Sequence, residues 1–399
     1  MEWPDDLDIQ ALLGRGWRPA PFREFVLKVH SRCDLACDYC YVYRFADQRW
    51  RRLPRTMSPR IAEMAGARIA EHARAHVLDR VNVVLHGGEP LLCSTDDLTH
   101  TVNAVREAVG DGIRVSITVQ TNGLRLDASY LRLFDRLGVT VGVSVDGDAS
   151  AHDRHRRTPG GTGSHAAVAR AVRRLGSPRF RHLFSGLLCV VDPRSDPAAV
   201  FEGLLDFEPP MIDFLLPHGH WSSPPPGRRV GDPGTPYADW LVEVFDRWYG
   251  TPGPQTRVRL FEGLLSLVLG GTSGVQGVGL DPVRIVVVET DGGIEQGDVL
   301  KTSRPGTPRS RLNIATDVFD RALLLPQIVA QQLGPEALAP ECRACRLRRV
   351  CGGGQYAHRY REGSGFEHPS VYCPDLYRLI SHIQQRIRAD LRALRGDAG

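Results

Sequence analysis

Short apolar runs rich in β-branched residues recur along the first half of the chain and alternate with segments of helical periodicity. The runs fall at 24–30, 81–86, 114–120, 139–145, 182–191 and 211–217. Helical patterns lie between them, for example at 58–78 and 164–175. Strands that alternate with helices predict a parallel sheet with right-handed crossovers. Six such units predict an α/β fold, a partial (β/α)6 barrel of the TIM type; a doubly wound open sheet is the alternative.

The pattern changes after the sixth run. Residues 222–236 are rich in proline and glycine and predict a long loop, and two helical stretches follow. From about 281 a strand, a TDGG turn and a second strand predict a hairpin, and 377–396 predicts a basic amphipathic helix. These changes predict five segments: an N-terminal extension (1–21), the barrel (22–225), a linker with bridging helices (226–278), a C-terminal domain (279–385) and a tail (386–399).

Polar and glycine-rich residues follow the predicted strands, at the barrel face where active sites are built. The strand ends read HSRC, HGGEP, QTNG, SVDG, CVVDP and PHGHW. Agreement across several strands predicts one site at this face.

Composition narrows the function. The 399 residues carry a net charge of only +4, too small and too dispersed to indicate nucleic acid binding. Lys28 and Lys301 are the two lysines, and arginine accounts for the rest of the fifty lysine and arginine residues. No signal peptide or membrane span is apparent, so we expect a cytoplasmic protein without a membrane partner. In that compartment, nine cysteines favour metal binding over disulfides.

Three cysteines follow the first strand with the spacing C-x3-C-x2-C: Cys33, Cys37 and Cys40. A zinc knuckle lacking one ligand, or cysteines buried as small apolar residues, are the simpler interpretations. Three thiolates on a [4Fe–4S] cluster would instead leave one iron open for chemistry.

Four more cysteines lie near the C-terminus: Cys342, Cys345, Cys351 and Cys373. Their spacing suits either a structural zinc ion or an iron–sulfur cluster. Cys93 and Cys189 lie in apolar contexts and are expected to be structural.

The three-cysteine loop, with Tyr39 before its last cysteine, resembles that of the radical S-adenosylmethionine (SAM) enzymes. The resemblance implies that SAM occupies the open iron and that its reductive cleavage yields a 5′-deoxyadenosyl radical. It also implies a set of SAM-binding residues, each of which could otherwise be a turn or cap residue. They are Tyr39, Gly87, Gly88, Glu89, Pro90, Thr121, Asn122, Ser144, Asp146, Arg156 and Leu188.

The four-cysteine set resembles the distal auxiliary [4Fe–4S] site of SPASM domains. Where two-cluster SPASM domains have further cysteines, this chain has Gly297 and Gln355. The resemblance therefore implies one auxiliary cluster and two clusters in total. Asp298 keeps the position of the aspartate that serves as a base in SPASM sulfatase maturases, although it could also be a turn residue.

Segments such as DFLLPHGHW and CGGGQYAHRY resemble the FxsB-type cyclophane-forming peptide maturases over about 20–380. This resemblance implies a radical SAM oxidoreductase that joins an aromatic ring to a β-carbon in a ribosomal precursor peptide. It implies that His218, His220 and Trp221 contact the peptide, and that a flavodoxin or ferredoxin donates electrons. No separate leader-binding domain is expected.

Two other interpretations stay open. One is a different radical SAM peptide modification: a thioether or ether crosslink, epimerisation, or oxidation of serine or cysteine as in sulfatase maturases. The other is a non-enzymatic iron–sulfur or zinc protein that binds a peptide.

Overall fold

Ten strands form one sheet in the computed structural model, which describes residues 3–229, 231–253, 256–394 and 396. Parts of the predicted extension, linker and tail (1–2, 230, 254–255, 395 and 397–399) lie outside the described residues. The strands are β1 (Glu24–His30), β2 (Arg80–Gly87), β3 (Arg114–Thr121), β4 (Thr140–Ser144), β5 (Phe184–Val190), β6 (Met211–Leu215), β7 (Arg257–Val258), β8 (Ile285–Val288), β9 (Gly293–Glu295) and β10 (Arg309–Asn313).

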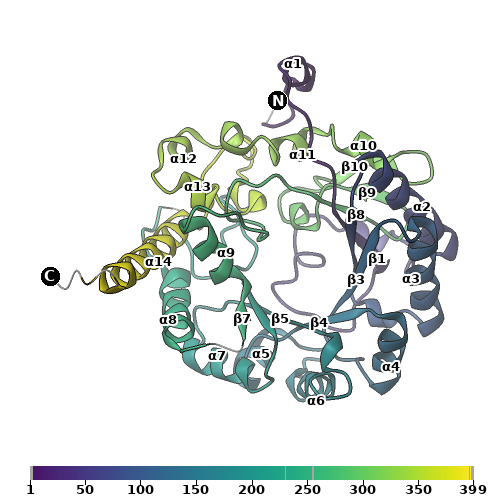
Figure 1. Ribbon diagram of the computed structural model, residues 1–399, viewed down its shortest axis with the longest axis horizontal. Coiled ribbons are helices and arrows are strands. Elements are labelled where there is room, and N and C mark those ends of the chain that lie inside the picture. Colours follow the sequence, from purple (N-terminus) through teal and green to yellow (C-terminus); the bar gives the residue numbers. More distant parts are fainter. Residues whose placement is uncertain (1–2, 230, 254–255, 395, 397–399) are drawn as a thin grey trace.

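The strand order is β10-β9-β8-β1-β2-β3-β4-β5-β6-β7. Strands β1 to β7 are parallel to their neighbours and follow one another in sequence, without the reversal of order that a doubly wound sheet requires. The helices between them cover the outside of a curved sheet (Figure 1). The partial barrel predicted from the sequence is therefore confirmed, and the open-sheet alternative is wrong.

Fourteen α-helices are assigned within the described residues. They are α1 (Ile9–Gly14), α2 (Pro59–Ala75), α3 (Thr95–Val109), α4 (Ala128–Leu137), α5 (Ala149–His155), α6 (His165–Leu175), α7 (Pro197–Leu205), α8 (Pro236–Gly250), α9 (Arg259–Val268), α10 (Phe319–Ala322), α11 (Pro326–Ala330), α12 (Pro340–Ala344), α13 (Arg348–Cys351) and α14 (Cys373–Leu394). Among the described residues, none of these helices is both long and apolar enough to cross a membrane.

The C-terminal segment continues the barrel sheet. Strand β8 pairs in parallel with β1. On either side of the predicted TDGG turn, β8 and β9 pair antiparallel, and β9 also pairs antiparallel with β10. The hairpin is thus confirmed, and its first strand also extends the main sheet. This pairing brings residues near 289–302 beside the strand that leads into the three-cysteine loop.

Some predicted boundaries were wrong. Helix α14 begins at Cys373 and not at 377, because Pro374 lies in the first turn, where its missing N–H costs no hydrogen bond. Helix α2 ends at Ala75, and Val77 just beyond it has a φ of 50°, in the left-handed region. Its start is as expected: the Ser58 hydroxyl accepts a hydrogen bond from the Ile61 N–H.

Candidate active site

The three-cysteine loop lies directly after β1, where the sequence placed it. The pKa of the Cys33 thiol is raised to about 12 and that of the Cys37 thiol to about 11. Burial is the main cause, and a neighbouring thiol of the loop contributes to each value. The Cys40 N–H donates to the Cys37 carbonyl at 3.3 Å, which folds the loop back on itself. The three thiols therefore lie close together, and their surroundings favour the protonated thiols. The positive charge of a metal centre would be needed to stabilise the thiolates.

The separation of the sulfurs distinguishes between kinds of metal centre. Four thiolates around one zinc ion lie roughly 3.8 Å apart, as Zn–S bonds of about 2.3 Å in a tetrahedron require. Among the described residues, no three cysteine Sγ atoms all lie within 4.8 Å of one another. Both cysteine sets are thus more widely spaced than a single zinc ion needs, and they suit a larger cluster.

The GGEP segment packs tightly against the three-cysteine loop. The Gly88 N–H donates to the His30 carbonyl at 2.8 Å, and the Glu89 N–H donates to the Arg32 carbonyl at 2.9 Å. A Cβ on Gly88 would overlap the Tyr43 hydroxyl and the Arg32 carbonyl, and one on Gly87 would overlap the His30 carbonyl. Glycine is therefore required here by the close approach of two backbones. Tyr43 was not predicted from the sequence.

Glu89 joins the ends of β2 and β3. Its carboxylate accepts hydrogen bonds from the Thr121 hydroxyl at 2.6 Å, the Asn122 N–H at 2.8 Å and the Leu91 N–H at 2.9 Å. The side chain is completely buried, and burial raises its pKa to about 7 despite these donors. Pro90 is also buried and starts the short turn 90–92. Glu89 thus holds the loops in place through bonds to the protein.

Asp146 holds a second set of predicted residues together. Its carboxylate accepts from the Tyr39 hydroxyl, from Arg156 Nε at 3.0 Å and from the Val190 N–H at 3.1 Å. The Arg156 guanidinium also lies over the Tyr39 ring, 5.6 Å from its centre. The Cys37–Cys40 segment is therefore fastened to the ends of β4 and β5. Leu188, also predicted, lies on β5.

Asn122 lies beside the first cysteine of the loop. Its side-chain nitrogen donates to Asp34 at 2.9 Å and lies 3.7 Å from the Cys33 sulfur. Ser144 accepts from Gln120, a residue that the sequence analysis did not single out, and pairs across strands with Leu188. The predicted residues therefore share one edge of the sheet, as parallel strands require.

The C-terminal cysteines also converge. Three of them lie in the region of α12 and α13, and Cys373 is the first residue of α14. Burial raises the pKa of Cys342 to about 11 and that of Cys351 to about 12, and neighbouring thiols of the set contribute to both values. The buried Arg359 guanidinium bonds to the carbonyls of Gly352, Gly353 and Gly354 beside them. Cys93 and Cys189, in contrast, are buried in the apolar core, as expected for structural residues.

Asp298 lies in a buried cluster of charges. It opens the 3-10 helix η4 (Asp298–Thr302), pairs with Lys28 on β1 and accepts from Lys301 at 2.7 Å. Burial alone would raise the pKa of Asp298, but Lys28 and Lys301 outweigh it and hold this pKa well below its usual range. Both lysines of the chain thus contact this one carboxylate. Neither lysine was predicted from the sequence as part of the site, although the presence of only two lysines among fifty basic residues was a usable signal.

A pocket of about 480 Å³ lies next to this cluster. Its walls are the segment after the cysteine loop (Arg44–Ala46), the end of η4 with the residues that follow it (302–305), and His220, Ser222, Ser223, Tyr360 and Glu362. Of the predicted peptide contacts, His220 lines this pocket and donates from Nε2 to the Thr302 carbonyl at 3.1 Å. His218 instead bonds to His358 at 3.1 Å, and the Trp221 indole donates to the Pro369 carbonyl at 2.7 Å.

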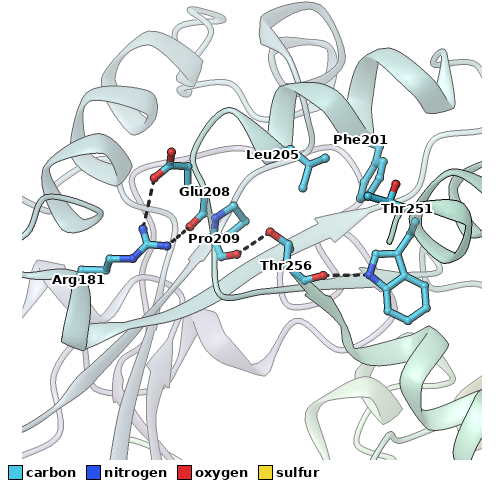
Figure 2. A pocket seen from close by; sticks show the side chains of 8 residues that line it. Arg181, Phe201, Leu205, Glu208, Pro209, Thr251 and Thr256 are labelled. Carbon is cyan, nitrogen blue, oxygen red and sulfur yellow. Dashed lines mark hydrogen bonds and ion pairs between the residues drawn. The ribbon is translucent and has the colours of Figure 1, made fainter. Parts of the chain in front are cut away.

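Figure 2 shows a second pocket, of about 240 Å³. Arg181, Glu208 and Thr256, which line it, precede β5, β6 and β7, so it lies at the amino ends of the strands. In barrels of this type the amino ends contribute to stability and the carboxyl ends carry the site.

The sequence profile of the radical SAM superfamily matches residues 27–195, which include the three-cysteine loop and every predicted SAM contact. Residues 27–195 form a radical SAM domain. The cofactors of such enzymes are a [4Fe–4S] cluster and SAM, as the sequence predicted, and the wide cysteine spacing suits the cluster.

Similarity to individual proteins extends beyond the radical SAM domain. The chain is 24% identical over 390 residues to a serine-type anaerobic sulfatase-maturating enzyme of Klebsiella aerogenes, spanning 95% of this chain and 89% of that protein. It is 23% identical over 359 residues to a cysteine-type anaerobic sulfatase-maturating enzyme of Clostridium perfringens, spanning 88% and 94%.

Two solved structures share the fold. The structure of native anSMEcpe with bound AdoMet superposes with a TM-score of 0.78 at 22% identity, covering 92% of this chain and 98% of that one. Streptococcus suis SuiB bound to its precursor peptide SuiA gives a TM-score of 0.60 at 15% identity, covering 91% and 78%. These findings do not support the finer resemblance to FxsB-type enzymes. Motifs that bind SAM are common to the superfamily and do not specify what the substrate radical does next.

Proposed function

We propose that this protein is a radical SAM enzyme that removes a hydrogen atom from a side chain of a peptide or protein and oxidises that side chain. The observation that carries the proposal is the pocket of about 480 Å³, whose walls combine the segment after the cysteine loop with the end of η4. One pocket is thus adjacent both to the radical-generating loop and to the element that bears Asp298. Similarity to serine- and cysteine-type sulfatase-maturating enzymes along most of the chain supports it.

In this proposal Cys33, Cys37 and Cys40 hold the [4Fe–4S] cluster, and the GGEP segment with Asn122 and Ser144 surrounds SAM. When bound and reductively cleaved, SAM supplies a 5′-deoxyadenosyl radical that accepts a hydrogen atom from the substrate β-carbon. Glu89 and Asp146 act by keeping the surrounding loops rigid, because protein donors already bind their carboxylates. Rigid placement of reacting groups is the main contribution that such residues can make.

For a serine side chain the remaining steps balance simply. The β-carbon loses a hydrogen atom, the hydroxyl then loses a proton, and one electron leaves as the C=O bond of the aldehyde forms. Asp298 is the proposed proton acceptor. The proposed electron acceptor is an auxiliary [4Fe–4S] cluster held by the four C-terminal cysteines, and an external flavodoxin or ferredoxin reduces the first cluster at the start of a cycle.

Formation of a ring-to-β-carbon crosslink is the second candidate. It begins with the same abstraction and also releases one proton and one electron. Its support is the presence of Gly297 and Gln355 where two-cluster SPASM domains have cysteines, which indicates a different electron path from that of such enzymes. A Cβ added at Gly277 would lie 3.2 Å from the Gln355 Cβ, and the Gln355 side chain accepts from the Tyr356 N–H.

The test is anaerobic reconstitution followed by incubation with SAM, a reductant and a peptide. Two peptide sources are compared: a cysteine peptide of the kind bound in the anSMEcpe complex with Kp18Cys, and the short reading frames adjacent to this gene, co-expressed with it. A carbonyl-reactive hydrazide detects an aldehyde, whereas loss of two hydrogens without hydrazide labelling indicates a crosslink. Formation of 5′-deoxyadenosine without modification of any candidate peptide would contradict the peptide-modifying function.

A further inference from the structure

A chain of buried charges leads away from Asp298. Lys301 lies at its centre, where its ammonium contacts Asp298 at 2.7 Å, Glu289 at 2.6 Å and Glu295 at 3.3 Å. Glu295 in turn pairs with Arg49 at 2.6 Å. Lys301, Glu289, Glu295 and Asp298 are each at least nine-tenths buried, whereas the Arg49 side chain is 23% exposed. The contacts therefore run from the interior of the barrel toward solvent.

The carboxylates on the two sides of Lys301 are unlike each other. Asp298 accepts charge-assisted hydrogen bonds from Lys28 and Lys301, which stabilise its ionised form. Glu295 is 1% exposed, and neither of its carboxylate oxygens makes an aligned hydrogen bond to a described residue; its contacts are ion pairs only. Burial therefore favours the protonated form of Glu295, and the ion pairs with Arg49 and Lys301 oppose it.

The charges that face Glu295 are Lys301, Arg49, Glu289 and Asp298. Burial raises the pKa of Glu295, Lys301 and Arg49 lower it, and Glu289 and Asp298 raise it, with a result of about 8. The pKa of Asp298 lies far lower. Burial thus favours the proton on an ionised Glu295 over Asp298, whose ionised form the two lysines stabilise, and the Lys301 ammonium contacts both carboxylates.

We infer that Lys301 and Glu295 form the outlet for the proton that the substrate releases, with Asp298 as the group that first accepts it. This inference rests on the proposed function. Where Glu295 is ionised, a state whose share grows as the pH rises through about 8, the protonated Asp298 carboxyl gives its proton to Lys301 as Lys301 gives one of its ammonium protons to the Glu295 carboxylate. Asp298 and Lys301 return to their starting charges, and Glu295 becomes neutral. No electron moves in this step. Lys301 and Glu295 are positioning residues that act through Asp298.

The outlet also resolves a difficulty with Asp298. A carboxylate paired with two ammonium groups is a weak base, because its proton is quickly returned to the donor. Removing that proton to a group of higher pKa makes the transfer effectively one-way.

The first test does not depend on activity. Infrared spectra of the purified protein are recorded on both sides of pH 8, and the Glu295→Gln variant is compared with wild type. We expect a protonated-carboxyl band that is lost as the pH rises through about 8 and is missing from the variant. The Asp213→Asn variant is the matched control, because Asp213 is 3% exposed, pairs with Arg259 and lies on β6, toward the opposite end of the sheet from β9. A band unchanged by Glu295→Gln would overturn the inference whether or not the enzyme modifies peptides.

The second test uses the reconstituted enzyme and a peptide that wild type modifies. Lys301→Arg keeps the positive charge, but a guanidinium does not give up a proton. We expect Lys301→Arg and Glu295→Gln to form 5′-deoxyadenosine at near wild-type rates and to raise the ratio of 5′-deoxyadenosine to product about tenfold. We also expect the rise of product yield with pH to be altered in Glu295→Gln. Full product yield from Lys301→Arg would mean that Lys301 acts through its charge alone and would overturn the relay.

Discussion

Asp298 and Lys28 form a buried ion pair that joins the C-terminal hairpin region to strand β1, five residues before Cys33. The pair exists because β8 adds to the sheet next to β1. The element that carries the proposed base is therefore held against the strand that carries the radical-generating loop.

Replacing Asp298 by asparagine should separate the two halves of the reaction. The asparagine amide cannot accept a proton, but it leaves the cysteine loop and the GGEP segment untouched. We expect product formation to fall by about 10²-fold or more while SAM cleavage largely persists. The measurement is 5′-deoxyadenosine and modified peptide in the same reaction. An unchanged product yield would remove Asp298 from the mechanism.

The pocket beside η4 can be tested by filling it. Ala46 is exposed and lines this pocket, so tryptophan there should obstruct the peptide without touching the cysteine ligands. We expect a higher KM for the peptide, with 5′-deoxyadenosine still formed in its absence. Thr251→Trp is the matched control, because Thr251 is exposed and lines the pocket of Figure 2. Equal effects of the two substitutions would argue against peptide binding at the pocket beside η4.

The sequence predicted the fold well because alternating apolar and helical patterns determine a parallel sheet directly. It also located the cysteine loop and the strand ends, since the carboxyl ends of parallel strands meet at one edge. The pairing of β8 with β1 could not be predicted, because it joins segments more than 250 residues apart. The roles of Lys28 and Lys301 were missed for the same reason: their shared partner becomes visible only when these segments meet. His218 and Trp221 were placed correctly at the end of β6, but their side chains contact protein groups and not the pocket.

Loss of the metal centre at one cysteine set should leave the metal content of the other set unchanged. Wild type should contain about eight irons, and Cys351→Ala should contain about four while still cleaving SAM, because its three-cysteine loop is intact. We expect Cys351→Ala to lose product formation in repeated turnover, since the electron from the substrate has no acceptor. Iron, sulfide and zinc analysis with electron paramagnetic resonance checks this. Four irons and one zinc in wild type would refute the auxiliary cluster. Cys93→Ala is the control variant, because Cys93 lies outside both cysteine sets.

Glu89 should give the protein a defined pH dependence of stability. Its pKa in the folded state is raised to about 7, above the value of about 4.3 in an unfolded chain. Its contribution is therefore fully present below about pH 4 and is lost as the pH rises through about 7. Glutamine cannot ionise. Its NH2 group replaces one of the two carboxylate oxygens, so it faces either the Asn122 N–H or the donors of Thr121 and Leu91, which leaves buried groups unsatisfied at every pH.

We therefore expect Glu89→Gln to be less stable than wild type by about 1–3 kcal/mol at acidic pH, with the difference narrowing as the pH rises through 7. Urea unfolding of both proteins at a series of pH values measures this difference directly. Comparing the two proteins at each pH cancels the titration of all other groups. A difference that widens with pH would mean that the three donors keep Glu89 ionised and would reverse the sign assigned here.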